Sequence, residues 1–297
     1  MSTTLREQYL DPAVLMQLGN LMLRARSVVE GTIAGMHRSP HKGSSVEFAE
    51  YKEYSPGDEV KHIDWKAFGK FDKYYVKQYE DETNLQATVV LDASGSMDFG
   101  TEGITKLDYA KILAASFAYF LIRQGDAAGA LVFADKPGLY LPPSSRTTHL
   151  DDLLHLLDAS PGRVVGTDIT AALRAMAERV RKRGLLLLVS DMLDNSPHVL
   201  DLAKVMRKRN QEVAIFHIID PAELELPWEG LTIFEGLEGE EELLVDPDDI
   251  RDRYREEMAL HLSELERTCR TGDIEYFRVL TTTPLEKVLM DFVIGRL

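Results

Sequence analysis

The sequence contains a single cysteine, Cys269, among 297 residues. One thiol cannot form an intramolecular disulfide, which fits a reducing compartment. Cys269 lies in a charged stretch with a helical pattern and has no base beside it, so thiol catalysis is not expected. The chain also lacks an apolar run that could span a bilayer, and its first residues do not resemble a signal peptide. We therefore expect a cytoplasmic protein without membrane insertion.

Basic residues are scarce relative to acidic ones. The chain has 34 Lys and Arg against 49 Asp and Glu, which gives a formal net charge of −15. An acidic surface repels phosphate backbones and anionic lipids, so binding to nucleic acid or to a membrane surface is disfavoured. The same charge attracts cations and basic protein surfaces. The sequence shows no internal repeat and no low-complexity segment, and its length permits a sizeable core.

Strand and helix patterns alternate from Leu85 to the C-terminus. The strand segments are apolar throughout and end at turn residues, which favours a mostly parallel sheet with helices on both faces. Pro142 and Pro143 suit an edge strand. The expected strands are 85–92, 127–134, 138–141, 185–189, 213–219 and 274–280, and the expected helices are 105–124, 147–158, 168–183, 196–209, 247–271 and 284–294.

The N-terminal part of the chain has a different pattern. A helix is expected from Pro12, with Asp11 as its cap, to Gly31, which favours a helix end. Two alternating stretches, 45–54 and 73–81, then predict a small antiparallel sheet. The two expected domains are 1–84 and 85–297, the second with a hairpin insertion near 224–246.

An Asp-x-Ser-x-Ser pattern follows the first apolar strand of the large domain. Alternate side chains of an extended chain point the same way, so Asp92, Ser94 and Ser96 are expected to converge, while Gly95 lets the backbone curve. Three small oxygen groups suit a hard divalent cation such as Mg²⁺, which keeps several waters. The alternative is an ordinary turn between a strand and a helix, where Asp and Ser are common.

Two later stretches add oxygen groups. Thr167 lies before an expected helix, where it is either a further ligand or the N-cap of that helix. Asp191 follows the apolar run 185–189. Ligands of open parallel sheets bind beyond the carboxyl ends of the strands, where the strand order reverses. If the strands that end near Asp92 and Asp191 are neighbours, these residues surround one cavity.

The three pieces together resemble a known family. Asp-x-Ser-x-Ser, Gly-Thr-Asp-Ile-x-x-Ala-Leu and an apolar strand ending in Ser-Asp are similar to the metal-ion-dependent adhesion site (MIDAS) of von Willebrand factor type A domains. This resemblance covers about Leu85 to the C-terminus. The motifs Gly-x-His-Arg-Ser, Glu-Phe-x-Glu-Tyr, Tyr-Ser-Pro-Gly-Asp and Ile-Asp-Trp-Lys-Ala resemble a prokaryotic family in which such a domain follows a small β-rich segment. Its members are typically encoded beside a MoxR-type AAA+ ATPase.

The resemblance implies a Rossmann-like fold and a set of metal ligands. Ser94, Ser96 and Thr167 would bind the ion directly, and Asp92 and Asp191 directly or through water. One coordination position would stay open for an acidic side chain of a partner. Mg²⁺ is the first candidate, with Mn²⁺ and Ca²⁺ as alternatives. The sequence departs from the family in having one Gly before Thr167 and in having Asp191-Met-Leu where Asp-Gly is usual, which alters the turn after that carboxylate.

The leading hypothesis is a non-enzymatic, metal-dependent protein-binding module that acts as an adaptor for a MoxR-type AAA+ ATPase or its client. The alternative is a metal-dependent hydrolase or phosphatase in which Asp92 attacks phosphorus. Against it, Ser94 stands where a second acid is needed, and no His or Lys is close in sequence. An extracellular adhesion domain is a third hypothesis, which the lone cysteine and the missing signal peptide disfavour.

Overall fold

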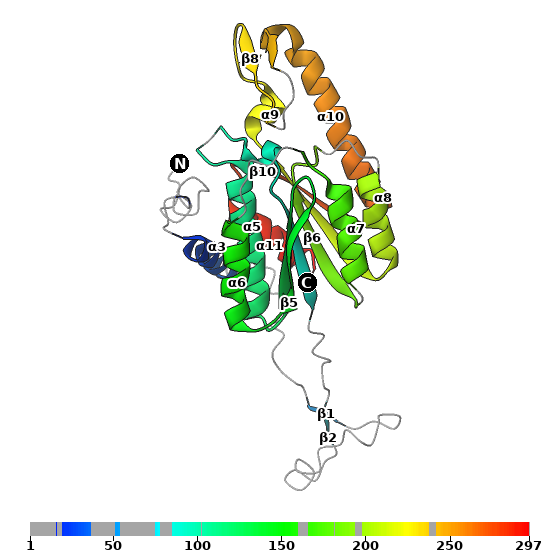
Figure 1. The fold of residues 1–297 in the computed structure, drawn as a ribbon. Coiled ribbons are helices and arrows are strands. Elements are labelled where there is room, and N and C mark those ends of the chain that lie inside the picture. Colours follow the sequence, from blue (N-terminus) through cyan, green and yellow to red (C-terminus); the bar gives the residue numbers. More distant parts are fainter. Residues whose placement is uncertain are drawn as a thin grey trace. The chain divides into compact units, whose positions relative to one another are not determined.

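A six-stranded sheet with the order β10-β7-β6-β3-β4-β5 forms the centre of the fold (Figure 1). Every neighbouring pair is parallel except β4 and β5, which are antiparallel. The prediction of an α/β fold with a mostly parallel sheet is therefore confirmed. The strands are β3 (Gln86–Asp92), β4 (Ala127–Phe133), β5 (Pro137–Ser144), β6 (Gly184–Ser190), β7 (Gln211–Ile219) and β10 (Glu275–Leu280).

The computed structural model describes part of the chain. The described residues are 16, 20–36, 51–53, 75–77, 85–101, 103–159, 166–180, 182–193, 198–237 and 242–296. The chain divides into two units, of which one is Ser39–Asn84 and the other is Met1–Arg38 with Leu85–Leu297. In the smaller unit β1 (Tyr51–Glu53) pairs antiparallel with β2 (Tyr75–Lys77), as the sequence predicted.

Two hydrophobic clusters cover the two faces of the large sheet. Alternate residues of one strand belong to different clusters: Val89 and Leu91 lie in the first and Val90 in the second. The first cluster packs against α3 (Leu21–Met36), α5 (Lys106–Arg123), α6 (Thr147–Asp158) and α11 (Leu285–Ile294). The second packs against α7 (Ile169–Arg179), α8 (His198–Lys208) and the C-terminal part of α10 (Pro247–Thr271).

The N-terminal helix differs from its prediction. In the described residues α3 begins at Leu21 and continues through Gly31 to Met36, so the expected end at Gly31 is wrong. The reason is tertiary packing: Val28 and Val29 are fully buried, and Thr32 Oγ1 donates hydrogen bonds to the carbonyl oxygens of Val28 and Glu286. Asp11 and Pro12, the expected start, lie outside the described residues.

The contacts of α3 also differ from the expected domain division. The helix packs against α5 and α11 and belongs to the larger unit, whereas the sequence interpretation placed it with the small β-rich segment. An apolar helix face needs a partner surface, and the face of α5 and α11 supplies it.

Several boundaries moved by a few residues. β5 extends across Pro142 and Pro143, which the edge position permits because an edge strand leaves one side unpaired. α7 ends at Arg179 rather than 183, since Val180 adopts an extended conformation. Ser196 and Pro197, the expected start of the next helix, lie outside the described residues, and α8 begins at His198.

A short helix and a hairpin extend from the carboxyl edge of the sheet. α9 (Pro221–Glu225) follows β7, and β8 (Thr232–Phe234) pairs antiparallel with β9 (Leu243–Val245), which confirms the predicted hairpin. Figure 1 shows α10 running alongside this hairpin and then down to the sheet. Within the described ranges, no helix is both long enough and apolar enough to cross a membrane.

Candidate metal centre

The order in which the chain adds strands to the sheet reverses between β3 and β6. After β3 the chain moves to β4 on one side and then returns to β6 on the other side of β3. Asp92 is the last residue of β3, and Asp191 follows directly after β6, with Leu91 paired to Val189 between the two strands. The two carboxylates therefore lie at the switch point, where open α/β sheets bind ligands.

Asp92 is fully buried and held at both oxygens. Its Oδ1 accepts a hydrogen bond from the Ser94 backbone N–H at 3.0 Å, and its Oδ2 accepts one from Ser190 Oγ at 2.7 Å. Burial, and next the charge of Asp191, raise the pKa of Asp92 to about 7, while the serine hydrogen bonds act in the opposite direction. One amide donor and one hydroxyl donor therefore do not fully stabilise the ionised Asp92 carboxylate, and a nearby cation would stabilise it further.

Ser94 and Ser96 lie together, although not for the reason expected from an extended chain. The backbone turns at Gly95 into the short 3₁₀ helix η2 (Gly95–Asp98), so Ser96 is not in extended structure. The turn nevertheless brings Ser94 Oγ to 3.1 Å from Ser96 Oγ. Ser94 is buried and Ser96 is half-buried, so this hydroxyl pair leads from the buried Asp92 toward the surface.

Thr167 lies in a loop at the same edge of the sheet. The neighbouring Asp168 N–H donates to the Ala134 carbonyl oxygen at 2.9 Å, which attaches the loop to the carboxyl end of β4, the strand beside β3. The N-cap of α7 is Asp168, whose Oδ1 accepts from the Ala171 N–H at 2.6 Å. Capping by Thr167, the alternative considered from the sequence, is therefore wrong. Gly166 adopts a φ of +92°, a conformation that glycine reaches without strain.

Asp191 has a partner that the sequence did not suggest. Its Oδ2 accepts from Lys106 Nζ at 2.8 Å, and its Oδ1 accepts from the Leu193 N–H at 3.3 Å. Lys106, in the first turn of α5, also donates to Glu223 Oε1 at 2.5 Å, and its side chain is completely buried. Burial by itself lowers the pKa of Lys106, but the charges of Asp191 and Glu223 outweigh it, so the pKa is raised and the ammonium stays charged.

Glu223 belongs to a capping box at the start of α9. Its Oε2 accepts from the Asp220 N–H at 2.8 Å, while Asp220 caps the helix. The pattern Asp220-Pro-x-Glu223 after an apolar strand is a sequence signal for such a cap. No comparable signal identified Lys106, because one lysine in the first turn of a helix is unremarkable.

The turn after Asp191 keeps a glycine-like conformation without glycine. Met192 has a φ of 55°, in the left-handed region, at the position where the resembled family usually has Gly. Its side chain is buried in the second hydrophobic cluster, and its N–H donates to Ser190 Oγ at 3.0 Å. This packing stabilises the left-handed backbone conformation of Met192, so the turn after Asp191 forms even though Met replaces the usual Gly.

The charges of these groups fit a divalent cation. Asp92, Asp191 and Glu223 carry three negative charges when ionised, and Lys106 neutralises one of them. Two negative charges then remain at a site that also offers two serine hydroxyls. In the described part of the chain, no group of three or more His, Cys, Asp or Glu side chains is arranged to hold a metal. A metal here would depend on hydroxyl oxygens beside two carboxylates, which is the donor set that the sequence predicted.

A family profile matches a large part of the chain. The profile of the family described as "Protein of unknown function DUF58" matches residues 50–264, which is more than half of the chain. The chain belongs to the DUF58 family. This DUF58 protein is 27% identical over 264 residues to "Uncharacterized protein Rv1480" of Mycobacterium tuberculosis and to "Uncharacterized protein Mb1516" of Mycobacterium bovis. Each match covers 88% of this chain and 82% of the relative.

Solved structures also show similarity to the DUF58 chain. An aerotolerance-related membrane protein from Bacteroides fragilis is 18% identical, with a TM-score of 0.49, over 72% of this chain and 100% of that one. BatB from Bacteroides thetaiotaomicron is 17% identical, with a TM-score of 0.49, over 71% and 98%. The SpRpn10 VWA domain is 15% identical, with a TM-score of 0.40, over 69% and 94%. These similarities are distant, and the α/β fold class is defined by the sheet order and the strand directions.

Proposed function

We propose that this DUF58 protein is a protein-binding module that holds a divalent cation with Asp92, Ser94, Ser96, Thr167 and Asp191. Mg²⁺ is the first candidate because it prefers oxygen ligands and retains several waters. The bound ion would supply an open coordination position that attracts a carboxylate of the partner. The residues of this chain would hold the ion at the carboxyl edge of the sheet and leave one side of the ion accessible to the partner.

The arrangement of Asp92, Ser94 and Ser96 is the observation that carries the proposal. Two neighbouring ligands of an octahedral Mg²⁺ with bonds of 2.0–2.1 Å are about 2.9 Å apart. The separation of 3.1 Å between the two serine hydroxyl oxygens is close to that value. Asp92 lies beneath them with an unbalanced buried charge, which a cation would neutralise.

The hydroxyl-rich donor set also explains how the partner is attracted. Neutral hydroxyls contribute no negative charge, and of the proposed ligands only Asp92 and Asp191 are charged. Asp191 shares its charge with Lys106, so the ion would keep part of its positive charge at its own position, while Glu223 pairs with Lys106 and not with the ion. An acidic side chain gains from this residual charge, whereas a site with four carboxylates would repel it.

Catalysis by Asp92 as a phosphoryl acceptor is disfavoured by its surroundings. The carboxylate is fully buried, and each of its oxygens accepts a hydrogen bond from Ser94 or Ser190. Lys106 does approach the site in space, but its two carboxylate partners keep it protonated, which removes it as a general base. We therefore propose a non-enzymatic role.

The partner is proposed from the family resemblance alone. A MoxR-type AAA+ ATPase or its client would present the acidic side chain, and this protein would act as an adaptor in the cytoplasm. A MoxR-type ATPase from the same organism is therefore the first protein to test for binding.

Metal binding is tested with Mn²⁺, whose free form is measured by electron paramagnetic resonance, and with Mg²⁺ by calorimetry. We expect wild type to bind either ion and the variants Asp92→Ala and Thr167→Ala to bind it much more weakly. Asp201→Ala removes an exposed carboxylate of α8 and serves as the matched control, with unchanged affinity. Equal affinity in wild type and Asp92→Ala would rule out the metal site.

Partner binding is tested separately by a pull-down of the 297-residue chain with a MoxR-type ATPase from the same organism. The complex should weaken in a chelator and in Thr167→Ala and stay intact in Asp201→Ala. Hydrolysis of p-nitrophenyl phosphate by wild type that disappears in Asp92→Asn would instead favour the phosphatase hypothesis.

A further inference from the structure

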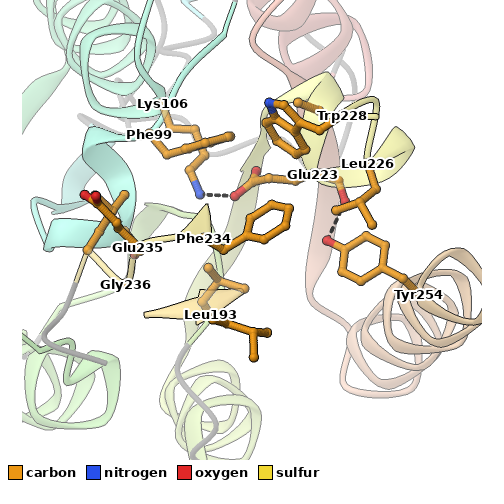
Figure 2. Close-up of a pocket in the computed structure, with 14 residues that line it drawn as sticks. Phe99, Lys106, Leu193, Glu223, Leu226, Trp228, Phe234, Glu235, Gly236 and Tyr254 are labelled. Atoms are coloured by element: carbon orange, nitrogen blue, oxygen red, sulfur yellow. Dashed lines mark hydrogen bonds and ion pairs between the residues drawn. The ribbon is translucent and has the colours of Figure 1, made fainter. Parts of the chain in front are cut away.

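A recess of about 400 Å³ opens beside the candidate metal centre and is walled by aromatic side chains. Figure 2 shows Phe99, Trp228, Phe234 and Tyr254 around it, with the ion pair of Lys106 and Glu223 among them. The Trp228 ring lies 5.4 Å from the Phe234 ring at an angle of 88°, and 6.4 Å from the Phe99 ring. We call this cavity the hairpin recess.

Separate elements fix the walls of the hairpin recess. Arg251 of α10 donates to the carbonyl oxygens of Leu226 and Trp228, at 3.0 and 2.7 Å, which fixes the segment after α9. Tyr254 Oη donates to the Glu223 carbonyl oxygen at 2.6 Å. Because the walls are held by α9, α10 and η2 as well as by the hairpin, the recess is formed without a ligand.

The rim of the hairpin recess exposes apolar side chains. Leu193, Leu237 and Leu243 line the recess and expose 49%, 47% and 59% of their surface. Ile233 and Leu244, cross-strand neighbours that expose 57% and 58%, are the next pair along the hairpin and therefore point to its opposite face, away from Phe234 and Leu243. Adjacent exposed aliphatic residues beside an aromatic cavity mark a surface that gains free energy when a partner covers it.

The charge around this apolar surface is predominantly negative, since Arg251, which fixes one wall, is paired with Asp248, and Arg255 is paired with Glu225. Between Glu229 and Asp249 the sequence contains nine Asp and Glu residues and neither Lys nor Arg. Glu235 lies on the recess itself, and the loop that joins β8 to β9 carries several of the others. Lys106 does not offset this charge, since it is buried and paired with two carboxylates. A complementary partner is therefore basic, and this charge repels nucleic acids and anionic lipids.

We propose that the hairpin recess binds a segment of a protein partner in which an apolar side chain is flanked by Lys or Arg. The apolar side chain enters the recess and packs against the Trp228 and Phe234 rings, and the basic side chains face the acidic hairpin. The stems of Lys and Arg also cover exposed apolar surface of the rim, such as Leu237 and Leu243. This binding needs no metal and is therefore a second recognition element, although Ser96 belongs to both the recess and the candidate metal centre.

Peptide binding to the full chain tests the proposal. The sequence has two tryptophans, so Trp65→Phe leaves Trp228 as a fluorescent reporter within the recess. The probes are twelve-residue peptides with a central Leu, Ile or Phe flanked by Lys and Arg, so that Trp228 remains the sole tryptophan in the sample. Matched peptides replace the central residue by Ser or the basic residues by Glu. We expect saturable binding of the basic apolar peptides that is at least about tenfold tighter than binding of either control peptide.

Variants locate the binding by anisotropy of labelled peptides. Phe234→Ala and Leu243→Ser are expected to weaken binding about tenfold or more, because both remove apolar contact area. Leu260→Ser is the matched control: Leu260 is an equally exposed leucine, at 66%, but it does not line the recess. Leu243 is exposed, so its replacement leaves the fold intact, which circular dichroism verifies. Binding should also weaken as salt concentration rises.

Three results would overturn the proposal: no binding by any basic apolar peptide, equal binding of the Glu-flanked peptides, or unchanged binding in Leu243→Ser. Loss of binding in EDTA would assign the effect to the metal centre instead. Binding that survives both EDTA and Asp92→Ala would support the recess even if the metal proposal failed. Sedimentation of the chain alone provides a further check, since a dimer that dissociates in Leu243→Ser would show that a second copy fills the recess.

Discussion

Lys106 Nζ lies 2.8 Å from Asp191 Oδ2 where the lysine side chain is fully buried and the aspartate exposes only 2% of its surface. A buried ammonium in this position supplies part of the positive charge that the carboxyl edge of the sheet requires. It also limits how Asp191 takes part in metal binding, because Oδ2 is paired with Lys106, while Oδ1 accepts only the longer hydrogen bond of 3.3 Å from the Leu193 N–H. An ion bound here would meet Asp191 through the other oxygen or through water.

Replacement of Lys106 by Met is expected to change stability and metal affinity in opposite directions. Without metal, the variant leaves Asp191 and Glu223 as unpaired buried charges, which lowers the free energy of unfolding by about 3–5 kcal/mol. The additional negative charge should raise Mn²⁺ affinity about tenfold or more. Urea unfolding in EDTA and Mn²⁺ titration measure the two effects. Lys106→Arg keeps the charge and serves as the control, and unchanged Mn²⁺ affinity in Lys106→Met would contradict the assigned charge balance.

The stability of the chelated protein should fall as pH rises toward neutrality. The pKa of Asp92 is about 7 in the folded protein, above its value near 4 in an unfolded chain, so between these values only the folded state holds the proton. Proton release therefore favours unfolding, and the free energy of unfolding falls as pH rises from about 4 through 7. Well above pH 7 both states are ionised and the contribution no longer changes.

Asp92→Asn isolates this effect. The amide has nearly the same shape but does not ionise, so the variant should lose the pH dependence and exceed wild type in stability at pH 8 in EDTA. Added Mg²⁺ should raise the midpoint of unfolding of wild type at pH 8 and leave the variant unchanged. Parallel pH profiles for the two proteins in EDTA would show that Asp92 is not the titrating group.

The strand ends were predictable because strong local signals define them. Continuous apolar runs identified β3 and β6, and a carboxylate after each run fixed Asp92 and Asp191 on the same edge of a parallel sheet. The pairing of β3 with β6 then places the two carboxylates close together, since neighbouring parallel strands have their carboxyl ends at the same edge of the sheet. Thr167 was correctly expected before a helix, but the hydrogen bond that caps α7 comes from Asp168.

Long-range pairing was not predictable from local patterns. Lys106 is separated from Asp191 by 85 residues and from Glu223 by 117. No local sequence pattern indicates pairs that are so far apart in the chain. The continuation of α3 past Gly31 has a similar origin, because the helix packs on α5 and α11. A glycine weakens a helix by at most about 1 kcal/mol, which tertiary burial readily outweighs.

Two glycine substitutions should have opposite effects on stability. A Cβ at Gly129 would lie 2.6 Å from the Leu141 carbonyl oxygen and 2.7 Å from the Pro143 nitrogen, so Gly129→Ala must push β5 away from β4. We expect it to lower the free energy of unfolding by about 2–3 kcal/mol. Gly35→Ala, in α3, meets only Met290 Sδ at 3.6 Å and should raise it by about 0.5–1 kcal/mol. Urea unfolding of both variants gives the comparison, and equal stabilities would argue against the close packing of β4 on β5.

Cys269 should be chemically inert in the folded protein. Its side chain is fully buried, and burial raises the pKa of the thiol to about 11, although the charge of Lys204 acts in the opposite direction. At pH 8 the thiolate is therefore rare, and labelling by 5,5′-dithiobis(2-nitrobenzoic acid) should be about a hundredfold slower than in urea. Because an unfolded thiol ionises near pH 9 and the folded one near pH 11, stability should also fall as pH rises between these values. Rapid labelling of the native protein at pH 8 would show that α10 does not stay packed on the sheet at this position.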